Sequence, residues 1–119
     1  MEKIYETALQ PEKVVLVAVN DCDNEQAVRE SLDELAELVK TAGAETVGHL
    51  IQNREKIHSA TYIGSGKLVE LKNAVEVLHA TGIVCDDELS PAQLKNLEKE
   101  LNTKIMDRTM VILDIFAKR

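Results

Sequence analysis

The sequence predicts an α/β domain of three layers, in which a four-stranded, mostly parallel sheet is flanked by helices. Short apolar runs alternate along the chain with segments whose apolar residues recur every three or four positions. The first pattern is typical of strands covered on both faces, and the second is typical of helices with one buried stripe. Their regular alternation favours right-handed crossovers between parallel strands. The length of 119 residues suits a single core.

The first strand and the first helix follow from the residue pattern. Residues 13–20 are apolar at consecutive positions, which is typical of a central strand. Asp23 or Asn24 can cap the helix that follows, with Gln26 as the capping-box partner of Asp23. Gly43 ends this helix, because glycine adopts the left-handed conformation without a Cβ clash. The buried stripe of the helix is expected to comprise Val28, Leu32, Leu35, Val39 and Ala42.

The same cycle of strand and helix continues along the chain. A second strand is expected at residues 46–51, followed by a loop at 52–61. The next helix is expected to end at Gly82, before a short buried strand at residues 83–85 and a last strand at 104–106. The stripes of the two helices in this part are, in order, Leu68, Leu71, Val75 and Leu78, and then Leu94, Leu97 and Leu101.

Ser90 carries a strong helix-start signal. Its hydroxyl can cap the helix, Pro91 occupies the first turn where its missing N–H costs nothing, and Gln93 completes a capping box. Asn102 is the expected stop of this helix.

The last segment differs from the other predicted helices. Residues 110–117 are apolar nearly all round, and neither glycine nor proline follows as a stop signal. A helix that continues into a longer protein and packs on a part absent from this chain would have this pattern. We therefore expect an α/β domain at residues 1–107 and the beginning of a helical linker at residues 108–119. The same apolar segment could let the isolated chain self-associate.

Composition and cysteine use exclude several classes of protein. No apolar run approaches the roughly 18 residues of a membrane span, and the first ten residues are too polar for a secretion signal. We therefore expect a cytoplasmic protein with no membrane span. Cys22 and Cys85 lie far apart and show no ligand spacing with the histidines, so neither a disulfide nor a zinc site is expected. Cys85 is expected in the core and Cys22 in a loop.

Basic residues gather in two segments of an otherwise acidic chain. The net charge of -7 at pH 7 disfavours nucleic acid as a general partner. Residues 53–72 and 104–119 nevertheless each carry four basic and two acidic side chains. This distribution indicates either two positive contact surfaces or ordinary variation in surface charge.

Residues 64–67, Gly-Ser-Gly-Lys, precede a predicted helix and are similar in part to a phosphate-binding loop. A P-loop needs glycine five positions before the Gly-Lys pair and a hydroxyl residue after it, where this chain has Thr61 and Leu68. Free N–H groups at a helix start could still receive a phosphate oxygen beside Lys67. The alternative is a turn that glycine permits, with the lysine in solvent.

Carboxylates follow the first and third predicted strands. Asp21, Asp23, Asp86 and Asp87 would then lie at the carboxyl edge of the sheet, where carboxylates could hold Mg²⁺ or a small ligand, as in a receiver domain. The alternative is that Asp23 caps a helix and that residues 86–88 lead into the helix start at Ser90. No nucleophile, base and orienting residue stand together, so we assign no catalytic residue, cofactor site or metal ligand to this chain.

Three stretches carry a resemblance to a known family. They are YIGSGK at residues 62–67 with 70–71, DDELSPAQ at 86–93 with 96–98, and DRT at 107–109 with ILDIFA at 112–117. Together they resemble the amino-terminal domain of the HflX family of translational GTPases, and the last stretch is the most specific. The first 50 residues match in pattern only.

The resemblance implies that a helical hairpin and a GTPase domain follow, and that GTP and Mg²⁺ bind there. It also implies that the parent protein binds the large ribosomal subunit and splits or rescues ribosomes. The candidates for contact with ribosomal RNA and protein are Arg54, Lys56, Tyr62, Gly64, Gly66 and Lys67. The candidates for packing on the linker or the GTPase domain are Arg108, Ile112, Ile115 and Phe116. Two other functions stay open: a small-ligand or Mg²⁺ domain that uses the four aspartates, and an intramolecular regulator of the GTPase domain.

Overall fold

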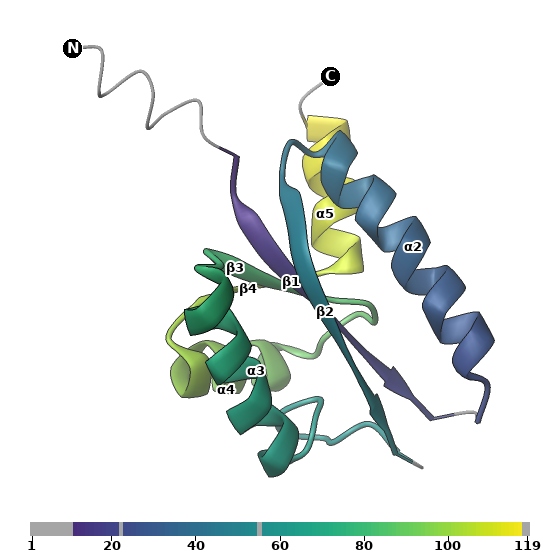
Figure 1. The fold of residues 1–119 in the computed structure, drawn as a ribbon, viewed down its shortest axis with the longest axis vertical. Helices are drawn as coiled ribbons and strands as arrows, with labels where there is room; N and C mark the ends of the chain where they lie inside the picture. Colours follow the sequence, from purple (N-terminus) through teal and green to yellow (C-terminus); the bar gives the residue numbers. More distant parts are fainter. Residues whose placement is uncertain (1–10, 22, 55, 118–119) are drawn as a thin grey trace.

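The computed structural model describes residues 11–21, 23–54 and 56–117 and has the predicted α/β architecture (Figure 1). The predicted loop position of Cys22 lies outside the described residues. Four strands form one parallel sheet in the order β2-β1-β3-β4. The strands are β1 (Lys13–Asn20), β2 (Glu45–Asn53), β3 (Gly82–Cys85) and β4 (Lys104–Asp107).

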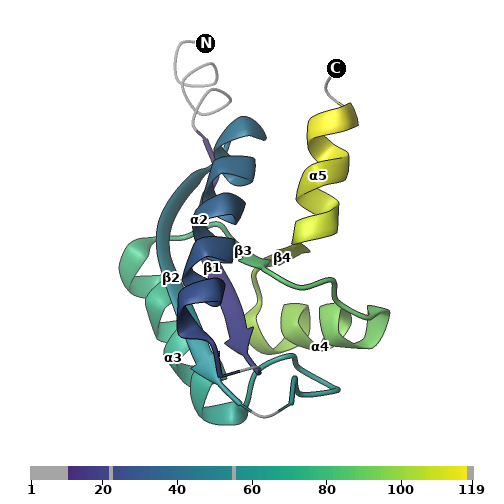
Figure 2. The same ribbon diagram turned by 90° about the vertical axis from the view of Figure 1, so that its right-hand side faces the viewer.

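Two helices cover each face of the sheet (Figure 2). One face packs on α2 (Glu25–Thr41) and α5 (Arg108–Ala117). The other face packs on α3 (Ser65–Leu78) and α4 (Pro91–Leu101). The prediction of a three-layer domain with a parallel sheet is therefore confirmed.

The central strand β1 contributes to both cores, because successive side chains of a strand point to opposite faces. The side that packs on α3 and α4 consists of Val15, Val17 and Val19, and the side that packs on α2 and α5 consists of Val14, Leu16 and Ala18. All of these side chains are buried, as is Cys85 in β3. The continuous apolar run of β1 and the core position of Cys85 are thus both explained.

The residue that caps α2 is Asn24. Its side chain accepts a hydrogen bond from the N–H of Ala27 at 3.1 Å, while Gln26 bonds to Glu30 one turn later. Of the two predicted caps, Asn24 is therefore confirmed, and Asp23, with Gln26 as its partner, is wrong. Asp23 has a left-handed φ of 51° and lies before the cap. Gly43 follows the end of α2 with a φ of 97°, as expected of a glycine stop.

Two of the later helix ends match the sequence and one does not. Ser90 and Gln93 form the expected capping box, and Asn102 ends α4 in the left-handed conformation. His79 ends α3 in that conformation, whereas Gly82 is already the first residue of β3. The prediction that Gly82 ends the helix is wrong, because a histidine three positions earlier takes that backbone role. Strand β2 also extends beyond the predicted residues 46–51 at both ends.

Leu35 lies fully buried between α2 and the sheet, so its truncation tests the packing of this layer. We expect Leu35→Ala to lower the free energy of unfolding by about 2–5 kcal/mol, because it leaves a cavity that the neighbours fill only in part. Val77→Ala on the exposed side of α3 is the control and should change it by less than about 0.5 kcal/mol. Urea denaturation measures both, and equal losses would contradict the packing described here.

Candidate functional site

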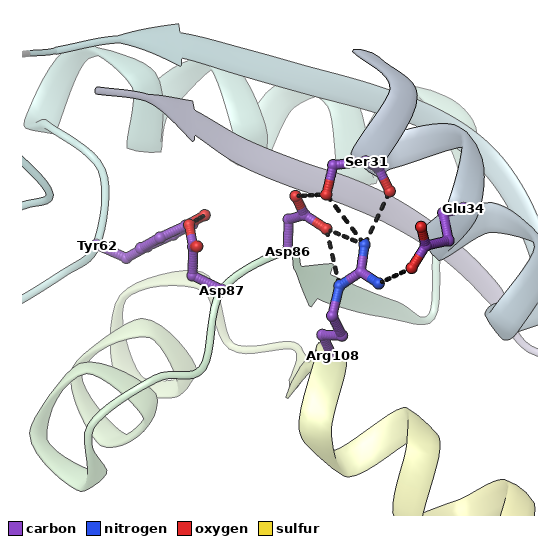
Figure 3. Close-up of polar contacts among 6 residues, drawn as sticks. All are labelled: Ser31, Glu34, Tyr62, Asp86, Asp87 and Arg108. Carbon is purple, nitrogen blue, oxygen red and sulfur yellow. Dashed lines mark hydrogen bonds and ion pairs between the residues drawn. The ribbon is translucent and has the colours of Figure 1, made fainter. Parts of the chain in front are cut away.

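Arg108, the first residue of α5, ties three parts of the fold together (Figure 3). Its guanidinium donates to Asp86 Oδ1, to Glu34 Oε1 and to the carbonyl oxygen of Ser31, each at 2.8 Å. The hydroxyl of Ser31 in turn donates to Asp86 Oδ2 at 2.7 Å. The Asp86 side chain is only 10% exposed and that of Arg108 21%. The attraction between the two charges therefore offsets part of the hydration free energy that each loses on burial.

Burial lowers the pKa of the Arg108 guanidinium, but its bonds to Asp86 and Glu34 outweigh this effect and raise the pKa overall. The guanidinium therefore stays charged. For Cys85, burial is the main cause that raises the pKa of the thiol, and the nearby carboxylates of Asp107, Asp87 and Asp86 add to it. A protonated, buried thiol is a packing group rather than a nucleophile.

Asp107, the last residue of β4, fixes the same junction. Its buried carboxylate accepts hydrogen bonds from the N–H of Met110 in the first turn of α5 and from the N–H of Leu89, both at 2.9 Å. No residue separates β4 from α5, because the strand ends at Asp107 and the helix begins at Arg108. The direction in which α5 leaves the sheet is therefore set by two adjacent side chains.

Asp87 follows Asp86 in the chain but bonds on the other side of the sheet, as Figure 3 shows. The hydroxyl of Tyr62 donates to Asp87 Oδ2 at 2.6 Å, and Tyr62 is 1% exposed. Burial, followed by the hydrogen bond and the charge of Asp87, raises the pKa of Tyr62 far above its usual range. Tyr62 is therefore held as a protonated donor.

The loop between β2 and α3 is tied to α4 by side-chain amides. Within the loop, His58 and Tyr62 pair through their backbones, with N···O distances of 3.1 and 2.9 Å. Gln93 donates to the carbonyl oxygen of His58 and Asn96 to that of Ala60, both at 2.9 Å. Tyr62 itself has a φ of 67°, which is uncommon for a residue other than glycine and persists here because its surroundings hold it.

Three of the predicted contact residues bring positive charge to this loop and to the start of α3. Arg54 Nε donates to the carbonyl oxygen of Lys56 at 3.1 Å, and Lys56 is exposed. Lys67 lies in the first turn of α3 and pairs with Glu70 at 2.8 Å. The guanidinium of Arg54 lies against Gly64, since a Cβ on that glycine would overlap it. The structure thus brings Arg54 to the start of α3.

The two glycines of the predicted phosphate cradle have different surroundings. Gly64 is buried, and its N–H donates to Gln52 Oε1 at 2.8 Å. Gly66 is exposed, with open space where a Cβ would lie. Helix α3 begins without a side-chain cap, and uncapped N–H groups at a helix start favour an anion.

Tyr62 is the predicted contact residue for which the structure gives a different role. Its ring lies in the core between the sheet, α3 and α4, so it has almost no surface with which to touch a partner. Its hydroxyl instead anchors the loop to Asp87. The residue was singled out from its place beside the glycines, and its burial depends on contacts that are distant in sequence.

The aspartates that follow β1 and β3 do not form one site. Asp86 and Asp87 are bound to Arg108 and Tyr62 respectively, and the cap of α4 is Ser90. Asp21 and Asp23 line a separate hollow of about 400 Å³ with Asn20, Asn53 and Arg54. Within the described part of the chain, no three His, Cys, Asp or Glu side chains are placed to hold a metal ion. The alternative of a magnesium site built from all four aspartates is therefore wrong, whereas residues 86–88 do lead into the helix start at Ser90, as the other interpretation predicts.

The apolar residues of α5 divide between the core and the surface. Ile115 packs against the core beside α2, and Ile112 is half-buried. Phe116 is 59% exposed and Leu113 is 62% exposed, and Met110 lies one further turn back on the same stripe. The exposed stripe of α5 therefore comprises Met110, Leu113 and Phe116 rather than the predicted Ile112, Ile115 and Phe116.

Sequence reasoning missed the partners of these residues. Ser31 and Glu34 lie outside the predicted buried stripe of the first helix, so the sequence predicts only that they are exposed to solvent. The sequence assigns Gln93 to its capping box and, together with Asn96, to the family resemblance, and neither assignment implies a bond to the loop. The sequence carries no signal for these contacts, because each joins positions at least 35 residues apart.

The comparison with protein families gives one decisive match. Residues 29–117 match the family described as "GTP-binding GTPase N-terminal". The chain is also 62% identical over 119 residues, its whole length, to the "GTPase HflX" of Lacrimispora saccharolytica. This chain belongs to the HflX family. The domain matches 28% of that relative, so it spans about a quarter of the length of the curated HflX proteins.

More distant HflX proteins match the same region. The "GTPase HflX" of Escherichia coli is 41% identical over 90 residues, which are 76% of this chain and 21% of that protein. A GTP-binding protein of Sulfolobus solfataricus, solved in complex with GDP, shares the fold with a TM-score of 0.60 at 22% identity. The superposition covers 89% of this HflX domain and 30% of the archaeal chain. The predicted resemblance to HflX amino-terminal domains is thus confirmed.

In the described part of the HflX domain, none of the helices has both the length and the apolar character that a membrane span needs.

We expect Tyr62 to stay protonated at pH values at which an ordinary tyrosine, with a pKa of about 10, ionises. Because its pKa is raised in the folded state, its contribution to stability is complete below about pH 10 and is lost as the pH rises further. A Tyr5→Phe variant leaves Tyr62 as the only tyrosine. Phenolate absorbance should then appear only together with the loss of circular dichroism, and ionisation near pH 10 in a folded chain would refute this assignment.

Proposed function

We propose that this HflX domain is an accessory contact module, which helps to dock a GTPase domain outside this chain on the large ribosomal subunit. The observation that carries the proposal is that Arg54, Lys56 and Lys67 gather at the loop before α3 and at the start of that helix, on a chain whose net charge is -7. We call these three residues the basic contact set. Ribosomal RNA is the partner whose chemistry fits them, because its phosphates attract lysine and arginine regardless of base sequence.

The surroundings of the basic contact set support this function. Hydrogen bonds from α4 hold the backbone of the loop at His58 and Ala60, and Arg54 is bonded to the carbonyl oxygen of Lys56, so the loop backbone that carries these charges is ordered before any partner binds. Pre-ordering reduces the entropy that binding costs. The uncapped start of α3, with exposed Gly66 beside Lys67, offers further N–H donors to a phosphate oxygen. The acidic remainder of the chain would discourage indiscriminate binding to RNA.

We further propose that nucleotide chemistry belongs to a part of the parent protein outside this chain. The relatives are named GTPases, and the matched region covers 28% of the first and 21% of the Escherichia coli protein. GTP, Mg²⁺ and hydrolysis would then belong to the GTPase domain, in a cytoplasmic protein that splits or rescues ribosomes. Residues 108–119 would begin the helical linker toward that domain, and Arg108 would set the direction of the linker.

The basic contact set can be tested by charge reversal in the full-length parent. We expect Arg54→Glu, Lys56→Glu and Lys67→Glu together to reduce the fraction that pellets with large ribosomal subunits by at least about tenfold, because phosphate contacts become repulsions. The matched control reverses three exposed lysines elsewhere, as Lys40→Glu, Lys95→Glu and Lys99→Glu. Equal retention of the two variants would remove the proposal, since both carry the same total charge.

The exposed stripe of α5 favours a second function, the restraint of GTP turnover through packing on the GTPase domain. Leu113 and Phe116 present apolar surface on the helix that leads out of the domain. Hydrolysis by the parent and by a form that lacks residues 1–107 should then differ severalfold, and identical rates would exclude restraint.

In the isolated chain, we expect the exposed stripe of α5 to cause weak self-association. Leu113→Glu should reduce it, because the substitution places a charge in the middle of the stripe. Sedimentation velocity at increasing concentration measures the effect. A chain that stays monomeric at all concentrations would contradict this expectation.

A further inference from the structure

The short segment at residues 86–90, between β3 and α4, is bonded to every layer of the domain. The backbone N–H of Asp86 donates to the carbonyl oxygen of Val17 in β1 at 2.8 Å. The N–H of Leu89 donates to Asp107 at the end of β4, and the N–H of Ser90 donates to Gln93 in α4. We call residues 86–90 the hub segment.

Two adjacent side chains of the hub segment reach opposite faces of the sheet. Asp86 binds Arg108 and Ser31 on the face covered by α2 and α5, whereas Asp87 binds Tyr62 on the face covered by α3 and α4 (Figure 3). Both bonds are short, at 2.8 Å for Arg108 and 2.6 Å for Tyr62. One peptide unit therefore joins the anchor of α5 to the anchor of the loop that leads into α3.

We propose that the hub segment couples the position of α5 to the conformation of the loop at residues 56–64, so that a change at either end alters the stability of the other. The physical basis is geometric. The aspartate carboxylates stand on short side chains, and the backbone between them is fixed to β1, so a displacement of Arg108 must be taken up by Asp86 and its neighbour. Packed interiors transmit such displacements, because they offer few voids in which to absorb them.

A second connection runs in parallel. Asp107 holds both the first turn of α5 and the N–H of Leu89, and Gln93 holds both the N–H of Ser90 and the carbonyl oxygen of His58. Two separate series of hydrogen bonds therefore connect α5, through the hub segment, to the loop. Coupling of this kind is reciprocal, since it is one free energy shared by two ends. It concerns elements of this chain alone and does not depend on the proposed partner.

Hydrogen exchange of the chain measures this coupling at both ends. Arg108→Ala should speed exchange of the amides at residues 58–64 at least threefold more than that of the β1 amides, which report opening of the whole domain. Tyr62→Phe keeps the ring and removes only the hydroxyl. It should speed exchange in the first turns of α5 by a similar factor, although that helix lies on the other face of the sheet.

Three further variants make the test decisive. Arg29→Ala removes an exposed arginine that pairs with Glu25 on α2, and it should leave the loop unchanged. Arg108→Lys keeps the charge but not the forked donor, so it reports on the coupling if the alanine variant fails to fold. In the double variant Arg108→Lys with Tyr62→Phe, the increase in the exchange rate of the loop amides should be smaller than the product of the increases in the two single variants. Exchange that changes only on the mutated face, or equally in β1, would overturn the proposal.

Discussion

The two central strands of the sheet, β1 and β3, are covered on both faces and meet water only at their ends, and this constraint governs the two aspartates that follow β3. β3 is buried along its whole length, and the chain becomes polar at Asp86, directly beyond it. A carboxylate that emerges there is 10% exposed and needs a partner, which Arg108 supplies at 2.8 Å. The next residue, Asp87, meets the same constraint on the other face and is bound by Tyr62. Removing either partner would leave a partly buried charge without compensation.

This arrangement connects the stability of the domain to its proposed work. The groups that satisfy the two aspartates stand at the root of α5 and in the loop before α3, which are the elements proposed to face the GTPase domain and the ribosome. A surface that binds phosphates gains from being ordered in advance, and here the order comes from hydrogen bonds made by Tyr62, Gln93 and Asn96. These residues support the contact surface from behind it.

The candidate site could be predicted only in part from the sequence. Arg54, Lys56 and Lys67 were found from local charge, which is a property of neighbours in the chain. Tyr62 was misassigned to the surface. The four aspartates do follow the carboxyl ends of neighbouring parallel strands, but they do not meet in one site. Both errors have one cause, because the face to which a side chain turns after the end of a strand depends on partners such as Ser31 and Arg108, which lie far away in the chain.

The fold class was determined by the sequence itself. The consecutive apolar residues of β1 and the apolar spacing of α2 and α4 are sufficient to predict it. Burial on both faces requires a continuous apolar run in a strand, and burial of one stripe requires apolar residues every three or four positions in a helix. The capping box at Ser90 and the glycine after α2 are equally local. Tertiary structure alone decided the strand order, the end of α3 at His79 and the division of α5 between core and surface. It also decided that the side chains of Asp86 and Asp87 bond on opposite faces of the sheet. These features depend on which distant groups compete for one buried space, and no local pattern records that competition.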